Sequence, residues 1–103
     1  MQINTKAKDL EITPAIKEYI EEKIGSVEKF LTRLENQEEA EADVEISRNT
    51  KHHHQGKVYD AKVNLHIKGG TLRAEYGDED VRAAIDKIKD ILKIEIEKFK
   101  SKK

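Results

Sequence analysis

The stretch "YGDEDVRAAIDKIKDILKIEIEKFKSKK", residues 76–103, decides the fold class of this chain. Its apolar residues recur at three- and four-residue spacing, which predicts an amphipathic helix. They are Val81, Ala84, Ile85, Ile88, Ile91, Leu92 and Phe99. Acids at residues 78–80 precede this helix, where we expect them to cap its start, and lysines follow toward its end, an order that complements the helix dipole. A helix of this kind buries only one face, so it needs a second layer to pack on.

The preceding residues predict that second layer as a sheet. Apolar and polar residues alternate in four segments, and this period is typical of strands with one buried face. The residues expected to face the helices are Ile3, Thr5 and Ala7, then Ala42, Val44 and Ile46, then Val63, Leu65 and Ile67, and last Leu72, Ala74 and Tyr76. Gly69 and Gly70 separate the last two strands and predict a hairpin there.

A second helix is predicted in "EITPAIKEYIEEKIGSVEKFLTRL", residues 11–34. Thr13 is its expected N-cap and Pro14 its first helical residue. Apolar residues on one face predict a single long helix as far as Leu34, with Gly25 as its weak point. The order β-α-β-β-β-α then predicts an α+β two-layer sandwich, in which both helices pack on one face of a four-stranded sheet.

Composition limits the classes of function. The 103 residues show no internal repeat, so we expect one domain over 1–103, flexible from about residue 100. A net charge of -1 excludes binding of nucleic acid by bulk attraction, so any anion-binding surface must be local. The absence of cysteine excludes disulfides and thiolate metal sites. With no membrane-length apolar run and no secretion signal, we expect a soluble, cytoplasmic protein without a membrane partner.

Catalysis is poorly supported by the sequence. There is no Ser/His/Asp or Cys/His arrangement and no glycine-rich phosphate loop, so we expect no enzyme, no cofactor and no small-molecule substrate. His52, His53 and His54 are consecutive, and such side chains point to opposite sides of an extended chain, which predicts a polar loop tip and no zinc site. His66 lies on the polar side of its strand, where we expect it to be solvated.

Cations follow the helices in stripes. On the first helix the spacing places Tyr19, Lys23, Ser26, Phe30 and Arg33 in one stripe. On the second helix Arg82, Lys89, Lys93 and Lys100 share one flank, and Lys87 and Lys98 share the other with Ile91 and Ile94. Two interpretations stay open: the long side chains cover the edge of the core and keep the protein soluble, or they bind an anionic partner.

The segments "EITPAIKEYI", "VEKF" and "DVRAAIDKI" resemble the ribosome hibernation promoting factor family, which includes the ribosome-associated inhibitor A protein and was formerly called the sigma-54 modulation proteins. The similarity runs from Met1 to about Lys100. It implies a fold like the double-stranded-RNA-binding domain with an added first strand. It also implies a non-catalytic protein that binds the small ribosomal subunit, through 16S-type rRNA and ribosomal proteins, near the decoding centre. There it would block messenger and transfer RNA and inhibit translation.

The resemblance implies a set of RNA contacts in this chain. They are Lys23, Lys29, Phe30, Arg33, Arg82, Lys87 and Lys98. We expect Lys23, Lys29, Arg33, Lys87 and Lys98 to line one surface, with Lys93 and Lys100 on the opposite flank. Ser26, Ile91 and Ile94 replace cations of the family, and the two isoleucines alternatively mark a protein contact.

Two other classes of function stay open beside the ribosome. One is a general double-stranded-RNA-binding domain. The other is a protein-interaction module, indicated by the isoleucines and by the acidic region Glu35–Glu45, which carries no cation and should face away from RNA. The chain looks like a short family member or the first domain of a long one. Whether it promotes or opposes ribosome pairing also stays open.

Overall fold

The computed structural model describes residues 1–31, 40–49 and 58–101. Its elements are β1 (Gln2–Lys8), α1 (Pro14–Gly25), the 3-10 helix η1 (Ser26–Phe30), β2 (Glu41–Arg48), β3 (Tyr59–Ile67), β4 (Gly70–Asp78) and α2 (Val81–Ser101). The predicted β-α-β-β-β-α order and the α+β class are confirmed.

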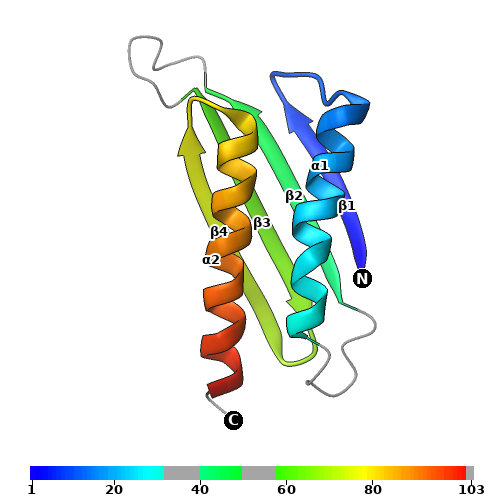
Figure 1. Cartoon of the computed structure of the whole chain (residues 1–103), viewed down its shortest axis with the longest axis vertical. Helices are drawn as coiled ribbons and strands as arrows, with labels where there is room; N and C mark the ends of the chain where they lie inside the picture. Colours follow the sequence, from blue (N-terminus) through cyan, green and yellow to red (C-terminus); the bar gives the residue numbers. More distant parts are fainter. Residues whose placement is uncertain (32–39, 50–57, 102–103) are drawn as a thin grey trace.

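The four strands form one sheet in the order β1-β2-β3-β4. β1 and β2 are parallel, and the other neighbours are antiparallel. A parallel pair needs a crossover connection, which α1 supplies. Both helices lie on the same face of the sheet and run in the same direction, α1 on the β1 side and α2 on the β4 side (Figure 1). The result is the predicted two-layer sandwich.

The core lies between the sheet and the helices. Its largest fully buried side chains are Ile20, Ile24, Val27, Leu31, Val44, Ile46, Val63, Leu65, Ile85, Ile88, Leu92 and Ile96. Each such side chain stabilises the fold by about 1.5–3 kcal/mol relative to an exposed position. Tyr76 departs from the predicted pattern, because 36% of its surface stays exposed at the edge strand β4. Leu34 lies outside the described residues.

The prediction of one long first helix is wrong beyond Gly25. The α-helix ends at that residue, and a 3-10 helix continues to Phe30. Glycine is a poor helix former, which favours a change of helix type at this point. The Ser26 hydroxyl donates to the Lys23 carbonyl over 2.6 Å at the junction. At the other end, the predicted cap is confirmed, since Thr13 Oγ1 accepts from the Ile16 N–H over 3.2 Å.

Local contacts also explain the start of α2 and the β3–β4 hairpin. Asp80 Oδ1 accepts from the Arg82 N–H, and Asp78 Oδ1 accepts from the Asp80 N–H, each over 3.0 Å. The predicted capping role is therefore confirmed for Asp80, whereas Asp78 accepts from an N–H that lies just before the helix. In the hairpin Gly69 has a φ of 103°, a conformation that only glycine adopts readily. The Phe99 ring packs directly against this turn.

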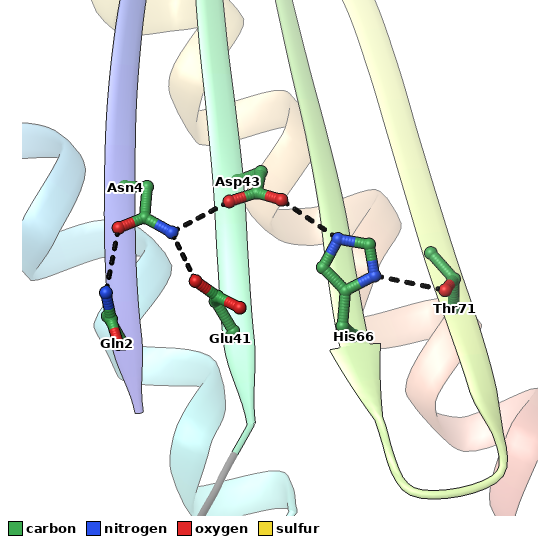
Figure 2. Close-up of polar contacts among 6 residues, drawn as sticks. All are labelled: Gln2, Asn4, Glu41, Asp43, His66 and Thr71. Carbon is green, nitrogen blue, oxygen red and sulfur yellow. Dashed lines mark hydrogen bonds and ion pairs between the residues drawn. The ribbon is translucent and has the colours of Figure 1, made fainter.

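The face of the sheet away from the helices, the open face, carries a hydrogen-bond network across all four strands. It joins Gln2, Asn4, Glu41, Asp43, His66 and Thr71 (Figure 2). His66 Nε2 lies 2.9 Å from Asp43 Oδ2, and its Nδ1 lies 3.1 Å from Thr71 Oγ1. His66 is exposed on the polar side of its strand, as predicted, but it also contacts side chains on both neighbouring strands. Hydrogen bonds from Asn4 and His66 lower the pKa of Asp43.

Candidate nucleic-acid interface

A hydrogen bond joins the two helices near their N-terminal ends. Tyr19 of α1 directs its hydroxyl toward α2 and donates to Asp86 Oδ1 over 2.7 Å. This bond to a carboxylate, followed by burial, raises the pKa of Tyr19 to about 12. The phenol therefore stays protonated at physiological pH and keeps donating, so it fixes α1 against α2.

Two cations lie over the Tyr19 ring. Lys23 Nζ from α1 and Arg82 Cζ from α2 are each 5.4 Å from the ring centroid. A cation at this range is attracted by the ring quadrupole, by roughly 0.5–1 kcal/mol at exposed sites. The ring thus has a positive charge from each helix within 5.4 Å of its centroid.

A second ring repeats this arrangement further along the helices. Phe30 ends η1, and Lys93 Nζ of α2 lies 5.0 Å from its centroid. Lys29 Nζ lies 5.4 Å from the same centroid. The two rings and their cations form what we call the inter-helix surface. It comprises Tyr19, Lys23, Lys29, Phe30, Arg82 and Lys93.

Several acids of the helix layer are engaged within the chain, although Glu18, Glu21 and Glu22 of α1 form no ion pair among the described residues. Glu28 accepts from the N-terminal ammonium, and Asp90, Glu95 and Glu97 pair with Lys89, Lys98 and Lys100. Among the described residues, by contrast, the side chains of Lys23, Arg82 and Lys93 form no ion pair. Their charges remain available to an anionic ligand, and this is the main electrostatic feature of the surface.

The structure divides the expected RNA-contact residues between two flanks of α2. Four of them, Lys23, Lys29, Phe30 and Arg82, lie in the inter-helix surface. Lys87 and Lys98 lie on the other flank, where Lys87 Nζ is 5.7 Å from the Tyr76 ring and Lys98 Nζ is 3.4 Å from Glu95 Oε2. Arg33 is outside the described residues.

Sequence reasoning missed two members of this surface. From the sequence, Lys93 is expected on the flank opposite Lys87 and Lys98 and outside the set of RNA contacts, and the pattern places Tyr19 in a cationic stripe without predicting an RNA contact for it. The helix period does place Lys93 beside Arg82, since residues eleven apart return to nearly the same side of a helix. Which flank faces the first helix depends on the packing of α1 and α2, which the sequence pattern does not contain.

The acidic region lies away from the inter-helix surface as far as the structure describes it. Glu41, Asp43 and Glu45 of β2 belong to the open face, on the opposite side of the sheet from the helices. Glu35, Glu38 and Glu39 fall outside the described residues. The part of this region that can be placed therefore does not screen the cations between the helices.

The expectation that no zinc site exists concerns the run of three histidines. His52, His53 and His54 lie outside the described residues. Within residues 1–31, 40–49 and 58–101, no group of three or more His, Cys, Asp or Glu residues is arranged to hold a metal ion. Nor is any helix in these ranges both long and apolar enough to cross a bilayer.

The fold and the inter-helix surface define a compact α+β domain that displays cations on its helical side. The chain belongs to the family described as Sigma 54 modulation protein / S30EA ribosomal protein, whose model matches residues 3–103. The resemblance drawn from the sequence is thereby confirmed.

Proteins similar to this chain differ in length. The chain is 34% identical over 103 residues to the ribosome hibernation promoting factor of Klebsiella oxytoca, covering 99% of this chain and 96% of that protein. It is 28% identical over 103 residues to the ribosome hibernation promotion factor of Deinococcus radiodurans, covering 99% of this chain but only 51% of that protein. The chain therefore spans about half the length of some relatives and nearly all of others.

A solved structure shares the fold. The Protein Y N-terminal domain of Thermus thermophilus superposes with a TM-score of 0.77 at 31% identity, covering 96% of this chain and 99% of that one. At this coverage the similarity includes α1 and α2, the two α-helices that contribute to the inter-helix surface.

Proposed function

We propose that this chain is a ribosome hibernation factor, or the ribosome-binding domain of one. It binds the small ribosomal subunit near the decoding centre and inhibits translation by blocking messenger and transfer RNA. The observation that carries this proposal is the family match over residues 3–103, nearly the whole chain. The inter-helix surface supplies a physical means of binding RNA. The protein acts in the cytoplasm, without catalysis.

Binding at this surface follows from its unpaired cations. Lys23, Arg82 and Lys93 approach rRNA phosphates and release the counterions condensed there, which favours association most at low salt. The Tyr19 ring holds Lys23 and Arg82, and the Phe30 ring holds Lys93, before RNA arrives. Less side-chain freedom is then lost on binding. The surface thus combines charge with preorganisation.

Inhibition needs only occupancy. The helices pack on the sheet through a shared core, and the Tyr19–Asp86 hydrogen bond joins them directly. A rigid domain that sits in the path of messenger and transfer RNA excludes them sterically. Competition therefore depends on the concentration and affinity of the domain.

The test is co-sedimentation with purified small subunits over a salt series. The variant Lys29→Glu with Lys93→Glu reverses two exposed cations that share the Phe30 ring. Its matched control is Lys6→Glu with Lys8→Glu, an equal change of charge on exposed β1 residues of the open face. We expect the first variant to bind at least about tenfold more weakly. Its slope of log affinity against log salt should fall by about 0.7–0.9 for each phosphate that the variant no longer neutralises.

Two results would overturn the proposal. The first is a parent protein that stays at the top of the gradient at low salt. The second is a control variant that weakens binding as much as Lys29→Glu with Lys93→Glu does. A further comparison, Lys87→Glu with Lys98→Glu, tests the other flank of α2 and should weaken binding less.

A competition experiment separates ribosome binding from general duplex binding. An excess of plain RNA duplex should leave the chain on the small subunit, because the proposed site is a particular surface of folded rRNA. Displacement by the duplex would instead identify a general double-stranded-RNA-binding domain.

A further inference from the structure

β4 forms a long free edge of the sheet. It contains nine residues, is the last strand in the sheet order, and pairs with β3 without interruption from Tyr59–Asp78 to Ile67–Gly70 (Figure 1). Its outer edge therefore presents backbone N–H and C=O groups that no described strand satisfies. Proteins usually protect such edges with charged side chains, above all lysine, with proline or with a bulge. β4 has no proline and no lysine, and its pairing register shows no bulge.

Two charged side chains on this strand have no partner within the chain. Arg73 and Glu75 are exposed on the open face, and among the described residues neither side chain makes an ion pair or a hydrogen bond. Glu75 stands opposite Lys62 on β3, but Lys62 Nζ instead lies 3.8 Å from Glu45 Oε1. The two charges are of opposite sign and stand two residues apart.

This spacing makes β4 complementary to itself. When two identical strands pair antiparallel around a two-fold axis at Ala74, Arg73 of each copy stands opposite Glu75 of the other. In this register odd-numbered residues of one strand stand opposite odd-numbered residues of the other. Side chains on the same face of the two sheets then meet, and the backbone groups at the outer edge can form the hydrogen bonds of the ladder. Centring the axis on Arg73 or Glu75 would instead place like charges opposite each other. The Ala74 register is thus the one that charge selects.

Apolar surface lies beside the same edge. Among the described residues, Tyr76 and Ile94 are the two large apolar side chains with the most exposed surface, at 36% and 55%. Tyr76 belongs to β4, and Ile94 shares the outer flank of α2 with Ile91 and Lys87. In the Ala74 register Tyr76 of one copy stands opposite Leu72 of the other, on the helix side. The two α2 helices also come to lie side by side, since α2 lies on the β4 side of its own sheet (Figure 1).

The other sheet edge lacks this complementarity. β1 is also terminal in the sheet, but its charged residues are Lys6 and Lys8 alone. No register of β1 against a second β1 joins opposite charges, and self-pairing there brings lysines together. The contrast identifies β4 as the edge suited to a second copy.

We propose that two copies of this chain associate through antiparallel pairing of their β4 strands, centred on Ala74, to form one continuous sheet with all helices on the same side. Such an interface is isologous, so each Arg73–Glu75 contact occurs twice. The inter-helix surface lies on the other flank of α2 and stays open in both copies. This inference does not depend on the proposed function.

Sedimentation equilibrium of the chain alone, over a concentration series reaching millimolar, tests the proposal. We expect a monomer–dimer equilibrium. Arg73→Glu and Glu75→Arg should each weaken it by about tenfold, because each puts two like-charged pairs across the interface. The double variant, Arg73→Glu with Glu75→Arg, restores opposite charges and should return the dimerisation constant to that of the parent. Lys6→Glu, a matched reversal on the other edge, should change nothing.

The double variant shows whether the contact between Arg73 and Glu75 holds the two copies together. A chain that remains monomeric at every concentration overturns the proposal. So does a double variant that fails to regain association, provided that circular dichroism shows both single variants and the double variant to be folded. Because no ribosome is present, neither result bears on binding to the small subunit.

Discussion

The hydrogen bond between Tyr19 and Asp86 predicts how firmly the two helices are held together. Tyr19→Phe removes the hydroxyl, keeps the ring, and leaves the Asp86 carboxylate without this donor. Hydrogen bonds to charged groups contribute about 1.5–3 kcal/mol, but Asp86 is only partly buried and water can replace the donor. We therefore expect the free energy of unfolding to fall by about 1–2 kcal/mol. In a domain of this size each kcal/mol lowers Tm by about 4–8 °C.

The same bond predicts a pH dependence. The pKa of Tyr19 is raised from its ordinary value of 10.0 to about 12 in the folded chain, so the folded state favours the protonated phenol. Its contribution to stability is complete below pH 10 and is lost as the pH rises through 12. The difference in unfolding free energy between the parent and Tyr19→Phe should therefore close over that interval. Subtracting the tyrosinate absorbance of the variant from that of the parent isolates the titration of Tyr19.

Tyr76→Phe is the matched control for this prediction. The Tyr76 hydroxyl makes no hydrogen bond among the described residues, so its removal should leave Tm unchanged. The reasoning is refuted if both variants lose the same stability, or if Tyr19 titrates near its ordinary value. Binding to small subunits should survive Tyr19→Phe, because the ring still faces Lys23 and Arg82, and should weaken in Tyr19→Ala.

Three further predictions concern stability. Gly69→Ala should lower the unfolding free energy, measured in urea, by more than about 1 kcal/mol. The φ of 103° suits glycine, and the new Cβ would lie 3.2 Å from the Phe99 ring. An unchanged urea midpoint would contradict this prediction. Thr13→Ala removes the N-cap of α1 and should cost about 1 kcal/mol in the same assay, whereas Thr13→Ser should cost much less. Asp43→Asn should destabilise by less than about 1 kcal/mol at neutral pH, since the pair with His66 is exposed. The pKa of Asp43 is lowered in the folded chain, so its ionised carboxylate stabilises the fold above the ordinary value of 3.8. This stabilisation is lost as the pH falls through the folded pKa. The unfolding free energies of the parent and Asp43→Asn should therefore become equal in acid.

The layers of this fold were predictable because burial on one face dictates the period of apolar residues. The two-residue period of β2 and the mixed three- and four-residue spacing of α2 each predicted the buried side chains found in the structure, such as Val44, Ile46 and Ile88. The caps Thr13 and Asp80 were predictable for a similar reason. A cap satisfies backbone donors two or three residues away, so its signal is local in the sequence.

The end of the first helix was not predictable from the same pattern. Val27 and Leu31 are buried, as the helical period requires, yet the backbone between them is a 3-10 helix. One turn of either helix type brings apolar residues to the core at similar spacing. Periodicity therefore predicted the buried face but not the change of helix type at Gly25. The 3-10 helix that follows Gly25 ends with Phe30, whose ring contacts Lys93 of α2.

Contacts between distant elements escaped prediction altogether. The His66–Asp43 contact joins two strands, and the Tyr19–Asp86 hydrogen bond joins two helices, across 23 and 67 residues. Which residues face each other there depends on strand register and on the relative position of the helices. Neither quantity is encoded in the spacing of residues along one element.

The flanks of α2 explain how a chain with a net charge of -1 can bind an anion locally. Several lysines of this helix are engaged by acids one or three residues away, and such pairs hold positive charge close to negative charge. Arg82 and Lys93 escape this neutralisation and instead meet the rings of Tyr19 and Phe30 from the first helical segment. An attractive surface therefore arises from the arrangement of partners and not from an excess of cations. The opposite flank, with Ile91 and Ile94, lies toward the proposed contact with a second copy, so the two proposed surfaces of this helix do not obstruct each other.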